Sequence, residues 1–160
     1  ILRWRKFRKA FGGYLSPETI EKLLREAKPG IRPAEVKHFQ FVVMLANETN
    51  PGEVPAIIST VMGTLVQHHA TVLNITSSLF VAVLGVPFDE GNSAEARRGL
   101  VDALLRDNGD RIRIVHGECD GAFGTFGGHG RWTYGAVIPG FSEILKKLLE
   151  SKFGTAAETS

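Results

Sequence analysis

The sequence of 160 residues contains one cysteine, Cys119, which excludes an intramolecular disulfide and fits a reducing compartment. No run of 18 or more apolar residues occurs, so we expect no segment of this chain to span a membrane. Tryptophan is scarce, with two residues, but ten phenylalanines add enough bulk for a core. The length and the hydrophobic fraction of 43% indicate one globular domain.

Patterns that mark common sites are also missing. The histidines at 68, 69 and 116 and Cys119 form no pair with the spacing of zinc ligands, so we expect no zinc site. The glycine-rich residues 121–128 carry no lysine and precede no helix start, which argues against a phosphate-binding loop and favours a twisted strand. Cys119 is interpreted as a small apolar residue rather than a catalytic thiol.

Basic residues are concentrated at the N-terminus. Five of the 19 basic residues lie in the first nine positions: Arg3, Arg5, Lys6, Arg8 and Lys9. The remaining chain has 14 basic and 17 acidic residues, so the net charge of +2 hides a body with a charge of −3. A nucleic-acid binder should carry a basic stripe on its folded body, so we expect no nucleic-acid partner.

Residues 1–13 form an arm that mixes cationic and apolar residues. Trp4, Phe7 and Phe11 recur at spacings of three and four, which is typical of one apolar face of a short helix. Two interpretations stay open, a solvated amphipathic helix or a juxtamembrane segment that follows a membrane-spanning helix. Because the sequence begins at Ile1 without a methionine, we expect a fragment of a membrane protein.

Residues 14–35 are predicted to form a connecting helix and a linker. Ser16-Pro17-Glu18 supplies a capping serine, a proline in the first turn and an early acid, and Lys28-Pro29-Gly30 ends the helix. Residues 36–153 are predicted to be the main domain. The small polar tail at residues 154–160 is expected to be disordered.

The main domain is predicted to mix strands and helices. Strands are expected at residues 38–46, 71–75, 79–86, 111–116 and 131–138, and helices at 54–66, 93–106 and 141–149. The glycine-rich stretch 117–130 is expected to be a strand or hairpin. The first six elements match the β-α-β-β-α-β unit of ferredoxin-like folds. The predicted fold class is α+β, an antiparallel sheet with helices on one face and an extra C-terminal strand or hairpin and helix.

Three segments resemble the class III adenylate and guanylate cyclases. Residues 41–47 (FVVMLAN) and 73–85 (LNITSSLFVAVLG) resemble two core motifs of that family. Residues 7–18 (FRKAFGGYLSPE) resemble the segment that leads into many bacterial cyclase domains. The resemblance runs from about Phe7 to Glu150 and implies the cyclase fold.

The same resemblance implies that two aspartates are replaced. In the family, one aspartate ends the first motif, another lies in the turn of the second, and the pair holds the metal ions. The matching positions are Asn47 and Ser78, which supply no negative charge for hard divalent cations. Glu48 is adjacent, but its side chain would point the other way if the strand continues. We therefore expect no metal site.

Four further positions are implied by the resemblance. The purine-reading lysine and acid of the family fall on Asn74 and Tyr134, and its transition-state asparagine and arginine fall on Glu143 and Lys147. Lysine replaces arginine only as a point charge, without its bidentate fork. A glutamate near a developing phosphorane would be repulsive.

The phosphate-binding segment is also altered. Asn47 and Ser78 stand 31 residues apart, which is closer than in typical members of the family. The segment that would cradle phosphates is reduced to residues 48–52, and Pro51 has no backbone N–H to donate.

Three functions remain open. The first is a catalytically impaired cyclase-homology domain that acts as a dimerisation and signal-relay module on the cytoplasmic face of the inner membrane, as a homodimer or as a heterodimer with a cyclase-like chain. The second is an active adenylate or guanylate cyclase, either by itself or with a complementing partner chain. Of the three functions, only this one would require Mg²⁺ or Mn²⁺ as a cofactor. The third is a small-molecule sensor without turnover.

Overall fold

The computed structural model describes residues 34–76, 78–128 and 131–159. The predicted arm, the connecting helix and nearly all of the linker lie outside the described residues, so those assignments stay predictions. Among the described residues, no helix is long and apolar enough to cross a bilayer.

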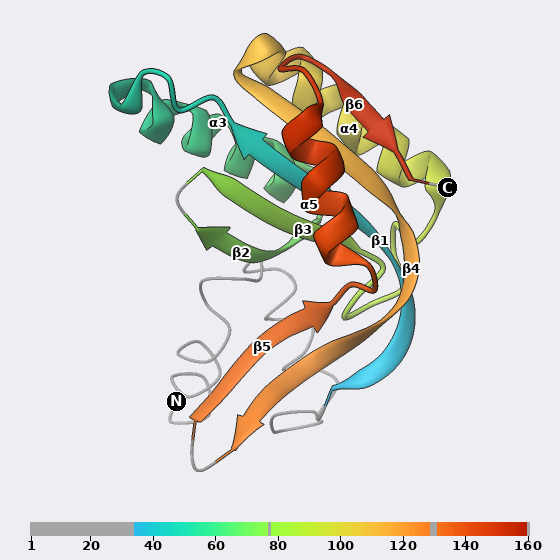
Figure 1. Ribbon diagram of the computed structural model, residues 1–160. Coiled ribbons are helices and arrows are strands. Elements are labelled where there is room, and N and C mark those ends of the chain that lie inside the picture. Colours follow the sequence, from blue (N-terminus) through green and yellow to red (C-terminus); the bar gives the residue numbers. More distant parts are fainter. Residues whose placement is uncertain (1–33, 77, 129–130, 160) are drawn as a thin grey trace, which may run out of the picture.

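The described chain folds around one antiparallel sheet with a short parallel addition (Figure 1). Its order is β2-β3-β1-β4-β5, with β6 paired to β4, and this confirms the predicted ferredoxin-like arrangement of the first four strands. The strands are β1 (Glu35–Ala46), β2 (Thr71–Thr76), β3 (Leu79–Leu84), β4 (Ile112–Gly128), β5 (Arg131–Val137) and β6 (Ala156–Glu158). The sheet is curled, so that β2 and β5 at its two ends come into contact.

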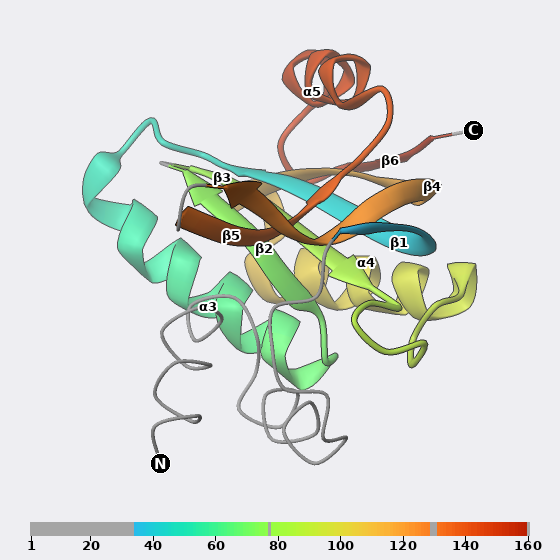
Figure 2. The same ribbon diagram turned by 90° about the horizontal axis from the view of Figure 1, so that it is seen from below.

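Helices cover both faces of the sheet (Figure 2). Helices α3 (Val54–Gln67) and α4 (Ala94–Asn108) lie on one face of the sheet. Helix α5 (Phe141–Glu150) lies on the other, so the prediction of helices on one face is correct for α3 and α4 and wrong for α5. The sequence offers Asn92 or Ser93 as the cap of α4, and the structure has Ser93, whose Oγ accepts a hydrogen bond from the N–H of Ala96 at 3.0 Å.

Strand β1 reads as a continuous apolar run because both of its faces are buried. Phe39, Phe41 and Val43 pack in the cluster beneath α5, while Val42 and Met44 pack in the cluster beneath α3 and α4. Two-sided burial removes the polar alternation that marks a strand with one solvent-exposed face. The strand therefore joins the two cores.

Strand β4 continues through the glycine-rich stretch, which confirms the strand prediction there. A Cβ at Gly117 would lie 2.0 Å from Thr159 Oγ1 and 3.0 Å from Phe41, and one at Gly121 would lie 2.4 Å from the carbonyl oxygen of Val137. These glycines let side chains and a neighbouring strand approach the backbone of β4.

The prediction of a disordered tail is wrong for residues 156–158. They form β6, which pairs in parallel with Ile114–His116 of β4. Gly154 and Thr159 donate backbone hydrogen bonds to Ile112 and His116 at 2.7 and 2.9 Å. The tail pairs with backbone groups on the outer edge of β4, about 40 residues away in the sequence. The composition of the tail cannot show that this distant edge is available.

Arg113 on β4 holds the end of α5. Its guanidinium donates to the carbonyl oxygens of Leu149 and Ser151 at 3.3 and 2.9 Å and lies 4.4 Å from the centre of the Phe153 ring. Cations are favourable at helix C-termini, where carbonyl groups lack intrahelical partners.

Two adjacent leucines of α5 test the packing of this helix. Leu148 is 1% exposed and Leu149 is 64% exposed. We expect Leu148→Ala to lower the free energy of unfolding by about 2–5 kcal/mol through a lost apolar contact and a cavity. Leu149→Ala should change it by less than about 0.5 kcal/mol. Urea titrations of both variants check this, and equal losses would show that α5 is not packed in this register.

Candidate functional site

The two positions that match the family's aspartates lie together. Asn47 follows the last residue of β1, and Ser78 lies in the β2–β3 turn. The backbone N–H of Ala46 donates to the carbonyl oxygen of Ser78 at 2.8 Å, which fixes the turn against the end of β1. The β1–β3 pairing therefore brings together two residues that are 31 positions apart.

The oxygen of the Asn47 side chain is used locally. It accepts hydrogen bonds from the backbone N–H and the hydroxyl of Thr49, at 3.0 and 2.7 Å. This is an Asx turn, in which the side chain imitates a backbone turn and ends the strand.

The prediction that Glu48 points away from this site is wrong. Strand β1 ends at Ala46, so strand alternation no longer sets the direction of Glu48. The hydroxyl of Ser78 donates to Glu48 Oε2 at 2.9 Å. The turn-forming residues 47–52 are visible in the sequence. The direction of the Glu48 side chain is not, because it depends on the position of Ser78 in the folded chain.

The donor set at this site does not fit two divalent cations. Such ions need several anionic oxygens, and Asn47, Glu48 and Ser78 supply one carboxylate, already bonded to a hydroxyl. Within residues 34–76, 78–128 and 131–159, no group of three or more His, Cys, Asp or Glu side chains is placed to hold a metal ion.

The segment after Glu48 uses its own backbone donors. It forms one 3-10 turn, η1 (Pro51–Glu53), in which the N–H of Gly52 donates to Asn50 Oδ1 at 3.2 Å and the N–H of Glu53 to Asn50 O at 3.0 Å. The open hollow beside it, about 490 Å³, is lined by Glu48, Pro51, Val54 and Pro55. An acid, two prolines and a valine offer no cation to a triphosphate.

The other family-matched residues lie apart from this hollow. Asn74 is in β2 beside a β-bulge, and Tyr134 is in β5 opposite Thr125. Both strands are at the ends of the curled sheet, which come into contact.

Glu143 and Lys147 are exposed on α5 and border a second pocket of about 260 Å³. Lys147 Nζ donates to the carbonyl oxygen of Glu158 at 3.2 Å. Cys119 lines the same pocket, and burial raises its thiol pKa to about 11. A protonated thiol is a poor nucleophile, which agrees with the apolar interpretation of Cys119.

A buried arginine was missed by the sequence analysis. Arg97 is 3% exposed on α4, and its Nε donates to His116 Nδ1 at 3.0 Å. It also donates to the side-chain oxygen of Gln40 and to the carboxylate of Glu158. The available signal was its position one turn before Leu100 and Val101, on the inward stripe of the helix.

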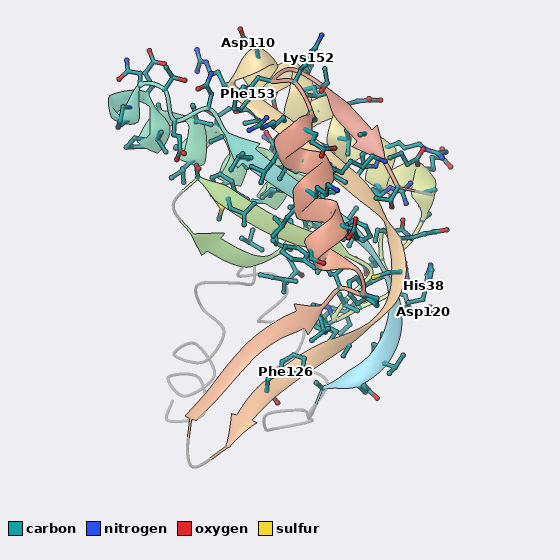
Figure 3. All side chains as sticks on the ribbon, viewed as in Figure 1. His38, Asp110, Asp120, Phe126, Lys152 and Phe153 are labelled. Atoms are coloured by element: carbon teal, nitrogen blue, oxygen red, sulfur yellow. The ribbon has the colours of Figure 1, made fainter. Side chains whose placement is uncertain are left out.

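A polar chain runs from this arginine to the surface. Gln40 Nε2 donates to Glu118 Oε2 at 3.1 Å, and His38 Nδ1 lies 2.8 Å from Asp120 Oδ1 (Figure 3). The hydrogen bond with Asp120 raises the pKa of His38, and the hydrogen bond from Gln40 lowers the pKa of Glu118. Gln40, His116 and Glu158 satisfy the buried guanidinium.

Comparison with known proteins identifies the architecture. No protein-family model and no curated protein matches the chain. Solved structures do match it. The guanylyl cyclase Cya2 has a TM-score of 0.62 at 14% identity, with 78% of this chain and 76% of that chain covered. A bacterial light-regulated adenylyl cyclase has a TM-score of 0.66 at 7% identity, with 84% and 46% covered.

A third match is the guanylyl cyclase domain of the RhoGC fusion protein from the aquatic fungus Blastocladiella emersonii, solved as a monomer and also as a dimer. The monomer has a TM-score of 0.60 at 11% identity, with 80% of this chain and 84% of that chain covered. The chain has a nucleotide cyclase fold. At these identities the likeness concerns the fold alone.

Within this cyclase fold, the Arg97 cluster predicts a pH-dependent stability. Burial and the neighbouring Arg97 lower the pKa of His116, so the unfolded chain binds the proton more readily. Stability should therefore fall as the pH drops below about 6.5, the ordinary histidine pKa. His116→Gln keeps an acceptor for Arg97 and should reduce the loss of stability between pH 7.5 and 5.5.

His38→Gln is the matched control, because the pKa of His38 is raised. Its contribution to stability is present at low pH and lost as the pH rises, so its removal should make the loss on acidification larger. Denaturant unfolding at the two pH values measures both. An unchanged loss in His116→Gln would contradict the assignment.

Proposed function

We propose that this chain is a cyclase-homology domain that has lost nucleotide cyclisation and acts as a dimerisation and signal-relay module, on the cytoplasmic side of a membrane-bound receptor-like protein. One observation carries the proposal. Where the resemblance places two metal-binding aspartates, the chain has Asn47 and Ser78, whose side chains are engaged by Thr49 and Glu48.

The chemistry of the reaction explains the weight of this observation. In cyclases, two divalent cations clamp the triphosphate and activate the ribose hydroxyl. Glu48 alone leaves this place with one negative charge instead of two, and its carboxylate already accepts a hydrogen bond. The short η1 turn adds a second obstacle, because Gly52 and Glu53 direct their N–H groups to Asn50 rather than to a ligand.

The proposed dimerisation and signal relay are supported by the fold and by the composition of the N-terminal arm. The matching RhoGC cyclase domain has been solved both as a monomer and as a non-canonical dimer, which supports dimerisation as an expectation for this fold. Five basic residues in the first nine positions are typical of the cytoplasmic end of a membrane-spanning helix. A domain that keeps the cyclase fold without cyclase activity could transmit a signal by a change in its dimerisation.

An activity assay tests the loss of chemistry. The purified chain is incubated with ATP or GTP and Mn²⁺, and cyclic AMP or cyclic GMP is measured. We expect no product above a protein-free blank. Cyclic nucleotide formed by the chain alone would refute the proposal, and product formed only after addition of a cyclase-like partner would favour the active heterodimer.

Restoring the two carboxylates separates metal binding from turnover. We expect Asn47→Asp with Ser78→Asp to increase Mn²⁺ affinity by about tenfold in calorimetry, because the site then holds three carboxylates. Activity should stay absent while η1 remains short. A control with two exposed aspartates elsewhere, Ser59→Asp with Ser142→Asp, should not gain this affinity. Cyclase activity in Asn47→Asp with Ser78→Asp would show that the short segment at residues 48–52 is sufficient to bind the triphosphate.

Light scattering at several concentrations tests pairing. We expect a mass that rises with concentration from 17.5 kDa toward twice that value. A monomer throughout the micromolar range would contradict self-association of this chain.

A further inference from the structure

The outer edge of β4 has a gap between two neighbours. β6 pairs with β4 over Ile114–His116, and β5 pairs with it from Ala122 onward (Figure 1). Between them, residues 118–120 pair with β1 on the inner side, and no strand of the described chain pairs with them on the outer side.

Backbone alternation leaves hydrogen-bonding groups in this gap. The carbonyl of Ile112, the N–H of Ile114 and the carbonyl of His116 all point outward, where Gly154, Thr155 and Thr159 bond to them. The same period of two directs the backbone groups of Glu118 and Asp120 outward. An extended segment could therefore pair with β4 here by hydrogen bonds to the backbone of Glu118 and Asp120.

The two faces of the gap differ in chemistry. On the α5 face lies the pocket of about 260 Å³, with Phe41, Cys119 and Ile144 among its apolar lining residues. On the α4 face lie the carboxylates of Glu118 and Asp120, whose side chains are 53% and 77% exposed. His38 lies beside both, and the cluster keeps a net negative charge even when His38 is protonated.

A strand that fits the gap must place apolar side chains on the α5 face and basic side chains on the α4 face. Directly opposed residues of paired strands point to the same face. Residues opposite Glu118 and Asp120 should therefore be basic, and the residue opposite Cys119 should be large and apolar. This basic–apolar–basic pattern suits either direction of pairing.

We propose that the N-terminal arm of the same chain docks here as a strand, with Trp4 in the pocket and with Arg3 and Arg5 beside the two carboxylates. The sequence Arg3-Trp4-Arg5 has the required pattern. An arm of 13 residues is marginal as an isolated helix, so the surface that it binds decides its conformation. The inference does not depend on the loss of cyclase chemistry.

The chain is long enough to make this contact within one molecule. The backbone N–H of Ala34 donates to the carbonyl oxygen of Thr125, seven residues along β4 from Glu118. That distance is about 23 Å along a strand. Residues 6–33 separate Arg5 from Ala34, and the 15 of them outside the helix predicted at residues 16–28 could alone extend over about 50 Å.

Trp4 fluorescence tests the proposal in the full chain carrying Trp132→Phe, in which Trp4 is the only tryptophan. We expect blue-shifted emission and weak acrylamide quenching, independent of protein concentration. Asp120→Lys should lower the ratio of docked to free arm by about fivefold, with red-shifted emission. Glu150→Lys, the same charge change on an exposed residue of α5, should leave the emission unchanged.

A second reporter position checks the register. Moving the tryptophan by Trp4→Phe with Phe7→Trp should give solvent-like emission, because residue 7 lies beyond the gap. Amide exchange at Glu118 and Asp120 should be slower in the unmodified chain than in Trp4→Ala, which keeps the test valid if Trp132→Phe fails to fold.

Several outcomes would overturn the proposal. Solvent-like Trp4 emission that shifts only when phosphatidylserine vesicles are added would assign the arm to a membrane. Burial that depends on concentration would assign the gap to the arm of a second copy. Equal amide exchange in the unmodified chain and in Trp4→Ala would show that no strand docks at the gap.

Discussion

The burial of β1 on both faces is the constraint on which the rest of this structure depends. Phe39, Phe41 and Val43 contribute to one core and Val42 and Met44 to the other, and each fully buried large side chain is worth about 1.5–3 kcal/mol. The strand pairs with β3 on one side and with β4 on the other. The Asn47 site lies where these pairings end, and residues 118–120 lie within the β1–β4 pairing.

At the end of β1, the tertiary structure brings together Asn47, Glu48 and Ser78. Ala46 anchors the β2–β3 turn, and beyond it the chain turns through Asn47 so that Glu48 meets Ser78. The hydrogen bonds there form two local pairs, one between Thr49 and Asn47 and one between Ser78 and Glu48. The proposed loss of cyclase chemistry rests on these two pairs.

The outer edge of β4 depends on the same strand order. Because β1 occupies the inner edge, the C-terminal segment and β5 share the outer one and leave residues 118–120 between them. The Arg97 cluster lies beneath this edge and links Gln40, His116 and Glu158, so the buried charge of α4 is balanced partly by the C-terminal strand. Through Arg97, the C-terminal strand is thus linked by hydrogen bonds to the middle of the sheet.

Local patterns determined the order of the helices and of the strands up to β5, a helix cap at residue 92 or 93 and the ferredoxin-like class, because periodicity and capping act over a few residues. The direction of Glu48, the buried Arg97 and strand β6 were decided only by the tertiary structure. Each depends on a partner 30 or more positions away, Ser78, Glu158 and β4 respectively. A sequence lists such groups but does not show which of them meet.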